Sequence, residues 1–307
     1  MAYDLRTLLD GYKLVEISNR TLHGRHLLRP CRQLNAIVTG ALARAQRNHG
    51  VLIHAYVVLS NHYHLLASFS DAQQMADFVR DFQAKIAKEV AQLYGWRTKI
   101  WAQRYDHIPV DPSDADQIQR LRYLLANGSK EGLVNSPLEW PGASAAKALY
   151  HGRNEIRGLW IDRTGLCRAR QRRTAVDPRD FHQTETLLLS PLPCWQHLTP
   201  EAYRLRLVEM IDAIARETRR QHRRNHTRPL GVRRILRHDP LQPTELTERR
   251  PKPRVHALKR AAREAFLFAY RAVVLAYRNA AQRLRRGHPQ PGFPTGCFPP
   301  GLPFVTS

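Results

Sequence analysis

The sequence predicts an α+β fold in which helices lie beside an antiparallel sheet. Three apolar segments, residues 12–18, 51–59 and 62–69, read as strands because they alternate or stay apolar over a strand's length. Residues 34–48 and 72–94 carry apolar side chains three and four positions apart, as amphipathic helices do. The order of strand, helix, strand, strand and helix, completed by a fourth strand, is the ferredoxin-like split arrangement.

Turn and capping residues set the boundaries of these elements, and they are Gly50, Ser60-Asn61, Ser70-Asp71 and Gly95. The turn at 60–61 makes the third strand antiparallel to the second. A short fourth strand is expected over 101–110. One further helix begins at Pro112-Ser113-Asp114 and runs to Gly128, so the sheet carries an appended helix.

Length and composition limit the classes of protein that fit. The chain has 307 residues, 43% of them hydrophobic, which is enough for a buried core and more than one domain. It contains no apolar run long enough to cross a membrane, and its first residues lack the pattern of a secretory signal. The four cysteines are scattered, with no Cys-x-x-Cys pair, which argues against a zinc ribbon or a disulfide scaffold. We therefore expect a cytoplasmic, nucleoid-associated protein.

The net charge indicates a polyanionic partner. Lys and Arg number 49 against 26 Asp and Glu, a formal charge of +23. Such an excess attracts nucleic acid and speeds association with it. A membrane surface or ribosomal RNA is the alternative, and GC-rich codon usage can account for part of the arginine content.

The chain divides into three regions by composition. Residues 1–150 hold the predicted sheet and its helices, and residues 151–199 form an Arg-rich connector that we expect to be irregular. Residues 200–307 form a basic, mostly helical region. Within it we expect helices at 200–224 and 255–286, a Pro-rich linker between them, and a Pro/Gly-rich tail.

Two histidines at the start of the third strand are candidate metal ligands. Side chains alternate between faces along a strand, so His62 and His64 project from one face and Tyr63 from the other. Two neutral imidazoles side by side can bind a divalent metal. The alternative is a strand whose histidines form ordinary hydrogen bonds or contact solvent.

The appended helix carries a second candidate pair. Tyr123 and Asn127 are four residues apart and share a helix face. If they meet His62 and His64, two imidazoles and an amide oxygen could hold a metal, with a phenol nearby to attack a phosphate. Alternatively, Tyr123 is a packed core residue and Asn127 caps the helix before Gly128.

Three stretches resemble the single-tyrosine transposases, the IS200/IS605-like enzymes and the REP-associated tyrosine transposases. The stretch VVLSNHYHLL at 57–66 resembles their His-hydrophobic-His signature. The stretch YLLANGSKEGLV at 123–134 resembles the family pattern YIxxNPVKAGLV, and WPGAS at 140–144 resembles the WPxSS that follows it. The resemblance covers roughly residues 10–150. The departure lies at Gly128-Ser129, where the family usually has Pro-Val.

The resemblance implies a role for each matching residue. His62, His64 and Asn127 would bind Mg²⁺ or Mn²⁺, and Tyr123 would be the nucleophile. The family cuts single-stranded DNA beside a hairpin and leaves a 5′-phosphotyrosine. From the residues themselves, four further side chains could contact that DNA, with a solvated or core role as the alternative: Arg104, Arg122, Lys130 and Trp101.

We therefore predict a metal-dependent DNA transposase that acts by two transesterifications, with hairpin DNA as partner and no membrane. A homodimer is one expected assembly, with Tyr123 acting in its own subunit or across the dimer. Two alternatives stay open. One is a catalytically reduced regulator that still binds DNA hairpins, and the other is a basic RNA-associated protein.

Overall fold

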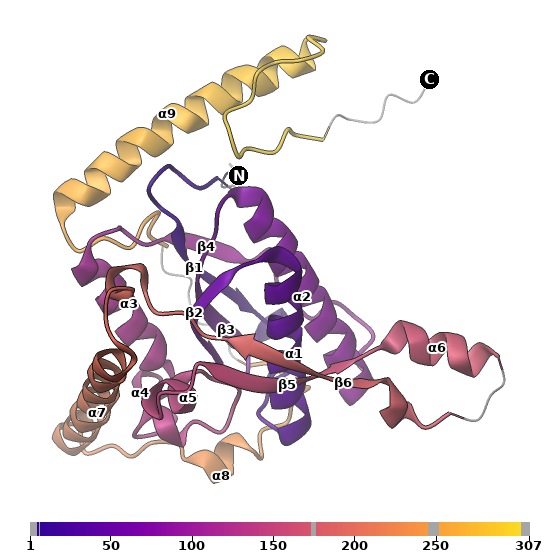
Figure 1. Cartoon of the computed structure of the whole chain (residues 1–307), viewed down its shortest axis with the longest axis vertical. Coiled ribbons are helices and arrows are strands. Elements are labelled where there is room, and N and C mark those ends of the chain that lie inside the picture. Colours follow the sequence, from indigo (N-terminus) through magenta and orange to yellow (C-terminus); the bar gives the residue numbers. More distant parts are fainter. Residues whose placement is uncertain (1–4, 6, 173–175, 245–251, 302–307) are drawn as a thin grey trace.

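The sheet at the centre of the molecule has the predicted ferredoxin-like order. The computed structural model describes residues 5, 7–172, 176–244 and 252–301. The central strands are β1 (Leu14–Arg20), β2 (Leu52–Val58), β3 (His62–Ser68) and β4 (Asp106–Pro109). They are arranged β2-β3-β1-β4, and each neighbouring pair is antiparallel (Figure 1). The predicted fold class is confirmed.

Helices cover both faces of this sheet. On one side lie α1 (Arg32–His49) and α2 (Ala72–Tyr94), which pack against each other. Both end at a glycine in the left-handed conformation, Gly50 (φ 65°) and Gly95 (φ 62°), as the sequence predicts. On the other side, α3 (Asp114–Leu125) contacts β2 and β3. The short helix α4 (Asn127–Lys130) follows α3 directly.

Several predicted boundaries were wrong by a few residues. The fourth strand is only four residues long, because Trp101 forms a single bridge to Thr21 instead of continuing it. The appended helix ends at Leu125, and Asn127 begins α4 instead of capping α3. The last helix, α9 (Arg260–Arg285), starts five residues later than predicted, since the backbone of His256 pairs with the β4 side of the sheet.

The prediction that residues 151–199 are irregular was wrong. They form a hairpin of β5 (Glu155–Ile161) and β6 (His182–Leu188), with α6 (Arg163–Gln171) between the strands, after the short helix α5 (Ala146–Tyr150). The hairpin packs on α1, where Gly158 meets Gly40 backbone to backbone. The strand pattern was hard to see because β6 is mostly exposed and buries only Glu185 and Leu187.

The linker prediction also needs correction. Leu230 and Gly231 donate backbone hydrogen bonds to Gly132 and Leu133, α8 (Val232–Ile235) follows them, and Thr244 bonds to Gly24. These contacts tie the stretch to the first region; its residues 245–251 lie outside the described part, as do the last residues of the predicted tail.

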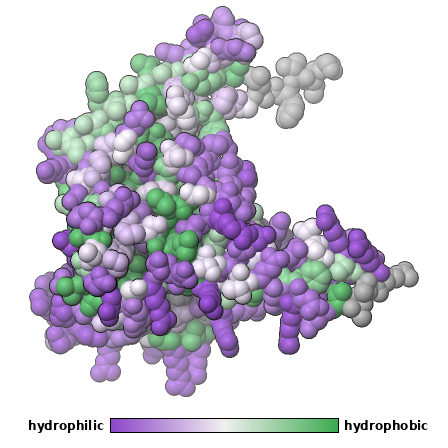
Figure 2. Space-filling view, in the orientation of Figure 1, coloured by the Kyte–Doolittle hydropathy of each residue, from purple (hydrophilic) through white to green (hydrophobic). Residues whose placement is uncertain are grey.

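The two long C-terminal helices lie in different places (Figure 1). The predicted helix at 200–224 is confirmed as α7 (Pro200–Arg224), and its apolar stripe packs against α3, α4 and α5. The helix α9 runs along one end of the molecule. Hydrophilic residues cover most of the face in Figure 2, and apolar ones show along α9, where Phe268 is 79% exposed. Among the described residues, no helix is long and apolar enough to cross a membrane.

Candidate active site beside Tyr123

The two histidines lie on one face of β3, as alternation requires. Their rings are 5.2 Å apart between centroids and meet edge to face. Tyr63, between them, is buried on the opposite face against Phe82 and donates nothing to this site. The face that carries the histidines is the face that α3 covers, and the rings of His64 and Tyr123 are 6.5 Å apart.

Each histidine has one ring nitrogen occupied by an acceptor oxygen. His62 Nδ1 lies 2.7 Å from Asn61 Oδ1, and His64 Nδ1 lies 2.7 Å from Glu16 Oε1. A ring nitrogen that faces an acceptor carries a proton, so in each ring Nε2 is the nitrogen left for a further ligand. Burial, His64 and Arg20 lower the pKa of His62 well below its usual value, which keeps this ring neutral.

Glu16 connects three distant parts of the chain. It is 3% exposed, in the middle of β1, and it contacts His64, Arg120 (2.5 Å) and His256 (2.8 Å). Burial acts to raise its pKa, but the hydrogen bonds from His256 and His64 and the charge of Arg120 hold the pKa well below the usual range. The carboxylate is therefore ionised and fixes the orientation of the side chains around it.

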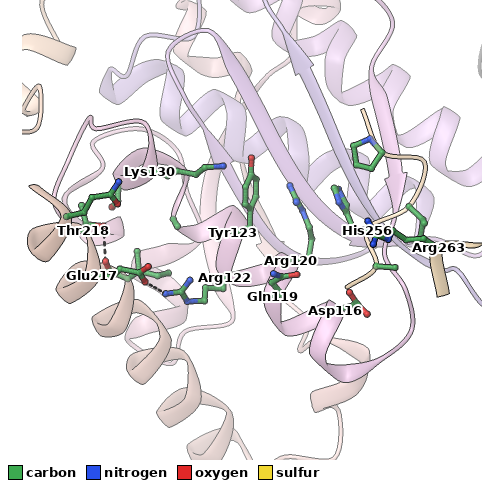
Figure 3. Close-up of a pocket in the computed structure, with 17 residues that line it drawn as sticks. Asp116, Gln119, Arg120, Arg122, Tyr123, Lys130, Glu217, Thr218, His256 and Arg263 are labelled. Carbon is green, nitrogen blue, oxygen red and sulfur yellow. Dashed lines mark hydrogen bonds and ion pairs between the residues drawn. The ribbon is translucent and has the colours of Figure 1, made fainter. Parts of the chain in front are cut away.

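Tyr123 stands between two cations. Arg120 lies 3.9 Å from the centroid of its ring, and Lys130 lies 4.0 Å from it (Figure 3). Both line a pocket of about 440 Å³ with Tyr123 and Arg122, and α7 and residues 253–263 supply most of the other lining residues. Cations on both sides of a phenol favour an anionic group beside its oxygen.

The four residues predicted to contact DNA lie in three different places. Lys130 and Arg122 line the Tyr123 pocket, although Arg122 is also paired with Glu217. Arg104 is exposed and lines a different pocket, together with Arg80. Trp101 packs edge-on against Tyr63, and its indole N–H donates to the carbonyl of Gln83, contacts that are those of a core residue.

Asn127 is buried one turn after Tyr123, and its side-chain amide donates to the carbonyl of Leu124 at 3.3 Å. Its role as third ligand remains a prediction. No group of three or more His, Cys, Asp or Glu that could hold a metal occurs among the described residues. The predicted donor set is different: two imidazoles with free Nε2 atoms, and an amide. That set fits Mn²⁺ better than Mg²⁺, because Mn²⁺ accepts imidazole nitrogen more readily and Mg²⁺ prefers oxygen ligands.

Sequence reasoning missed Glu16, Arg120 and His256. Arg120 lies three residues before Tyr123, so its place on the same helix face was predictable. A charged residue in the middle of an apolar strand was the signal for Glu16. His256 stands at the end of a charged, Pro-rich stretch, and nothing in its local sequence indicated that it would bind Glu16.

Comparison with known proteins places these residues in a family context. The family model described as "Transposase IS200 like" matches residues 32–124, a stretch that contains His62, His64 and Tyr123 and stops before Asn127. The chain has no significant match among curated proteins.

Two solved structures are similar in part. A REP-associated tyrosine transposase bound to a REP hairpin is 17% identical with a TM-score of 0.37, over 47% of this chain and 82% of that one. A proposed transposase from Deinococcus radiodurans R1 is 16% identical with a TM-score of 0.27, over 39% and 92%. At these values the two structures say nothing about the activity of this chain. The family match at residues 32–124 shows that the chain resembles the IS200-like single-tyrosine transposases.

Proposed function

We propose that this chain is a DNA transposase that cuts and rejoins single-stranded DNA through Tyr123. The arrangement that supports the proposal best is Tyr123 standing between Arg120 and Lys130 beside His64, whose Nδ1 is held by Glu16. It combines a nucleophile, charges that attract a phosphate, and an oriented imidazole.

In the proposed first step, the Tyr123 hydroxyl attacks the phosphorus of a phosphodiester. The new bond joins the tyrosine oxygen to phosphorus, and the bond to the 3′-oxygen breaks. The tyrosine proton leaves and the 3′-oxygen gains one, so the products are a 5′-phosphotyrosine and a free 3′-hydroxyl. In the second step, the 3′-hydroxyl of another end attacks the phosphotyrosine and restores Tyr123. The covalent link stores the bond energy, so no nucleoside triphosphate is needed.

The side chains around Tyr123 have separate tasks in this proposal. Arg120 and Lys130 attract the phosphate and offset the charge that grows on its oxygens. His62, His64 and Asn127 would hold Mn²⁺ or Mg²⁺, which when bound supplies Lewis-acid polarisation of the phosphate. Glu16 keeps His64 in one orientation. Hairpin DNA is the proposed partner, which places the protein at the nucleoid, and a homodimer remains a prediction.

The test is a set of labelled single-stranded hairpin oligonucleotides incubated with the protein and Mn²⁺ or Mg²⁺. We expect a covalent adduct that is lost in Tyr123→Phe and in His62→Ala. Tight hairpin binding without an adduct, unchanged in Tyr123→Phe, would instead indicate a regulator that has lost catalysis. Preference for RNA, with no strand cleavage in either metal, would indicate an RNA-associated protein.

A further inference from the structure

Ser129 has a buried hydroxyl with nothing to bond to. The residue is 3% exposed, within α4. Its Oγ has no hydrogen-bond partner among the residues that the structure describes. Burying a hydroxyl without a partner destabilises a fold, so a side chain that bonds only when a ligand arrives is one explanation for keeping it.

The location of Ser129 indicates which ligand that would be. Ser129 lines the pocket that also holds Tyr123, Lys130 and Arg120. In the same pocket the Nε of Arg120 is a second buried donor with no partner in the described part of the chain. Two buried donors without acceptors, on residues that line one pocket, can be satisfied by a ligand that brings several acceptor oxygens.

The charges in the pocket favour an anion. Its two acidic residues are already engaged: Asp116 accepts hydrogen bonds from Ser113 and from the backbone of Leu258, and Glu217 is paired with Arg122. The other charged side chains in the lining are cationic, Arg120, Lys130 and Arg263, and of these Arg120 is paired with Glu16. A phosphodiester is an anion with two non-bridging oxygens, and it can accept from several donors at once.

We propose that the Ser129 hydroxyl donates a hydrogen bond to a non-bridging oxygen of the phosphodiester bound beside Tyr123. The proposal deepens the function proposed above and rests on it for the identity of the ligand. Ser129 stands where the resembling motif has valine, which cannot make this bond. This chain thus gains a substrate contact at a position that is apolar in the motif.

The experiment measures binding separately from cleavage. The probe is a ten-residue oligothymidylate, and the protein is the full chain carrying Tyr123→Phe, so that no chemistry intervenes. Into this background we would place Ser129→Ala, and the isosteric pair Ser129→Thr and Ser129→Val. We expect Ser129→Ala to raise the Kd about tenfold relative to Ser129, as for loss of one hydrogen bond to a charged group. Ser129→Val should raise the Kd about tenfold relative to Ser129→Thr for the same reason.

Two controls make the result specific. With an oligothymidylate that carries neutral methylphosphonate linkages, the Kd difference between the Ser129 protein and Ser129→Ala should shrink, because the one non-bridging oxygen that remains is uncharged and accepts a weaker hydrogen bond. The ligand-free Ser129→Ala protein should melt no lower than the parent, since it loses only an unpartnered hydroxyl. A purely structural serine would instead lower the melting temperature and leave the Kd unchanged.

Equal Kd values for Ser129 and Ser129→Ala would overturn the inference. So would a Kd difference that is as large with the methylphosphonate probe as with the phosphodiester probe. Neither result depends on strand cleavage, so the proposed function can fail while the Ser129 contact stands, and the contact can fail while a Tyr123 adduct still forms.

Discussion

His64 Nδ1 lies 2.7 Å from Oε1 of Glu16. This contact decides which nitrogen of His64 can face a ligand, because Nδ1 donates to Glu16 and Nε2 is the ring nitrogen that remains. Glu16 is also paired with Arg120 of α3 and with His256 of the C-terminal region. Both regions therefore help to fix the orientation of the His64 ring.

Glu16→Gln should weaken metal binding without touching a ligand. The amide can present its N–H to His64, and then the ring no longer has a fixed acceptor at Nδ1. Removing a carboxylate that orients a metal-binding histidine typically reduces metal affinity 10- to 100-fold. Titration of Mn²⁺ by calorimetry or electron paramagnetic resonance measures this loss directly.

Glu89→Gln provides the matched control. Glu89 is a buried carboxylate paired with Lys85 and Arg163, away from the Tyr123 pocket. We expect this variant to lose stability and keep its Mn²⁺ affinity. If both variants bind Mn²⁺ as tightly as the parent, Glu16 does not orient a ligand.

Removing the metal should stop adduct formation. After chelation, we expect Mn²⁺ to restore the reaction at a concentration about tenfold lower than Mg²⁺, because imidazole nitrogens suit manganese better. His64→Ala should need still more metal, whereas His151→Ala, an exposed residue, should behave as the parent. Rates that are the same with and without a chelator would contradict the metal assignment.

Acid should destabilise the protein through His54. This residue is 1% exposed at the irregular point of the β2–β3 pairing, and its ring bonds to the Ser190 carbonyl and to the Ser68 hydroxyl. Burial lowers its pKa from 6.5 to about 4. Between these values the unfolded chain binds a proton that the folded chain does not, so stability falls as the pH drops from 6.5 to 4, by about 3 kcal/mol.

Urea unfolding at pH 7 and pH 4.5 checks the role of His54. His54→Gln removes the titrating group, so the loss between the two pH values should be smaller in the variant than in the parent. An identical loss in both proteins would assign the acid sensitivity to other groups.

Gly158→Ala should detach the β5–β6 hairpin from α1. A Cβ at this position would lie 2.1 Å from the backbone nitrogen of Gly40, and backbone cannot move aside as a flexible side chain can. We expect a loss of about 2 kcal/mol in the free energy of unfolding. Gly292→Ala is the control, because nothing lies within 4 Å of the added Cβ. A Gly158→Ala protein as stable as the parent would mean that the hairpin does not pack this closely.

The sequence predicted what depends on local periodicity. The ferredoxin-like order, the Gly50 and Gly95 helix ends and the shared face of His62 and His64 all follow from spacing along the chain. The family resemblance singled out Tyr123, and the match to residues 32–124 includes it.

Long-range pairing was beyond the reach of periodicity. Glu16 and His256 are 240 residues apart, and their contact depends on how the chain returns to the β4 side of the sheet. The hairpin of β5 and β6 was missed because most residues of its strands are exposed or only half-buried, so the strands show little of the apolar pattern of a buried strand. Trp101 packs against Tyr63, whereas Lys130 lies over the ring of Tyr123. This difference also depends on long-range packing, which the local sequence does not show.

The most direct measurement of the central claim is mass spectrometry of the protein after reaction with hairpin DNA. Trypsin cuts after Arg122 and Lys130, so Tyr123 is the N-terminal residue of the tryptic peptide 123–130. After nuclease trimming, we expect this peptide to carry a nucleotide joined to Tyr123 through a 5′-phosphate. A nucleotide on a different tyrosine, or cleaved DNA with peptide 123–130 unmodified throughout, would contradict it.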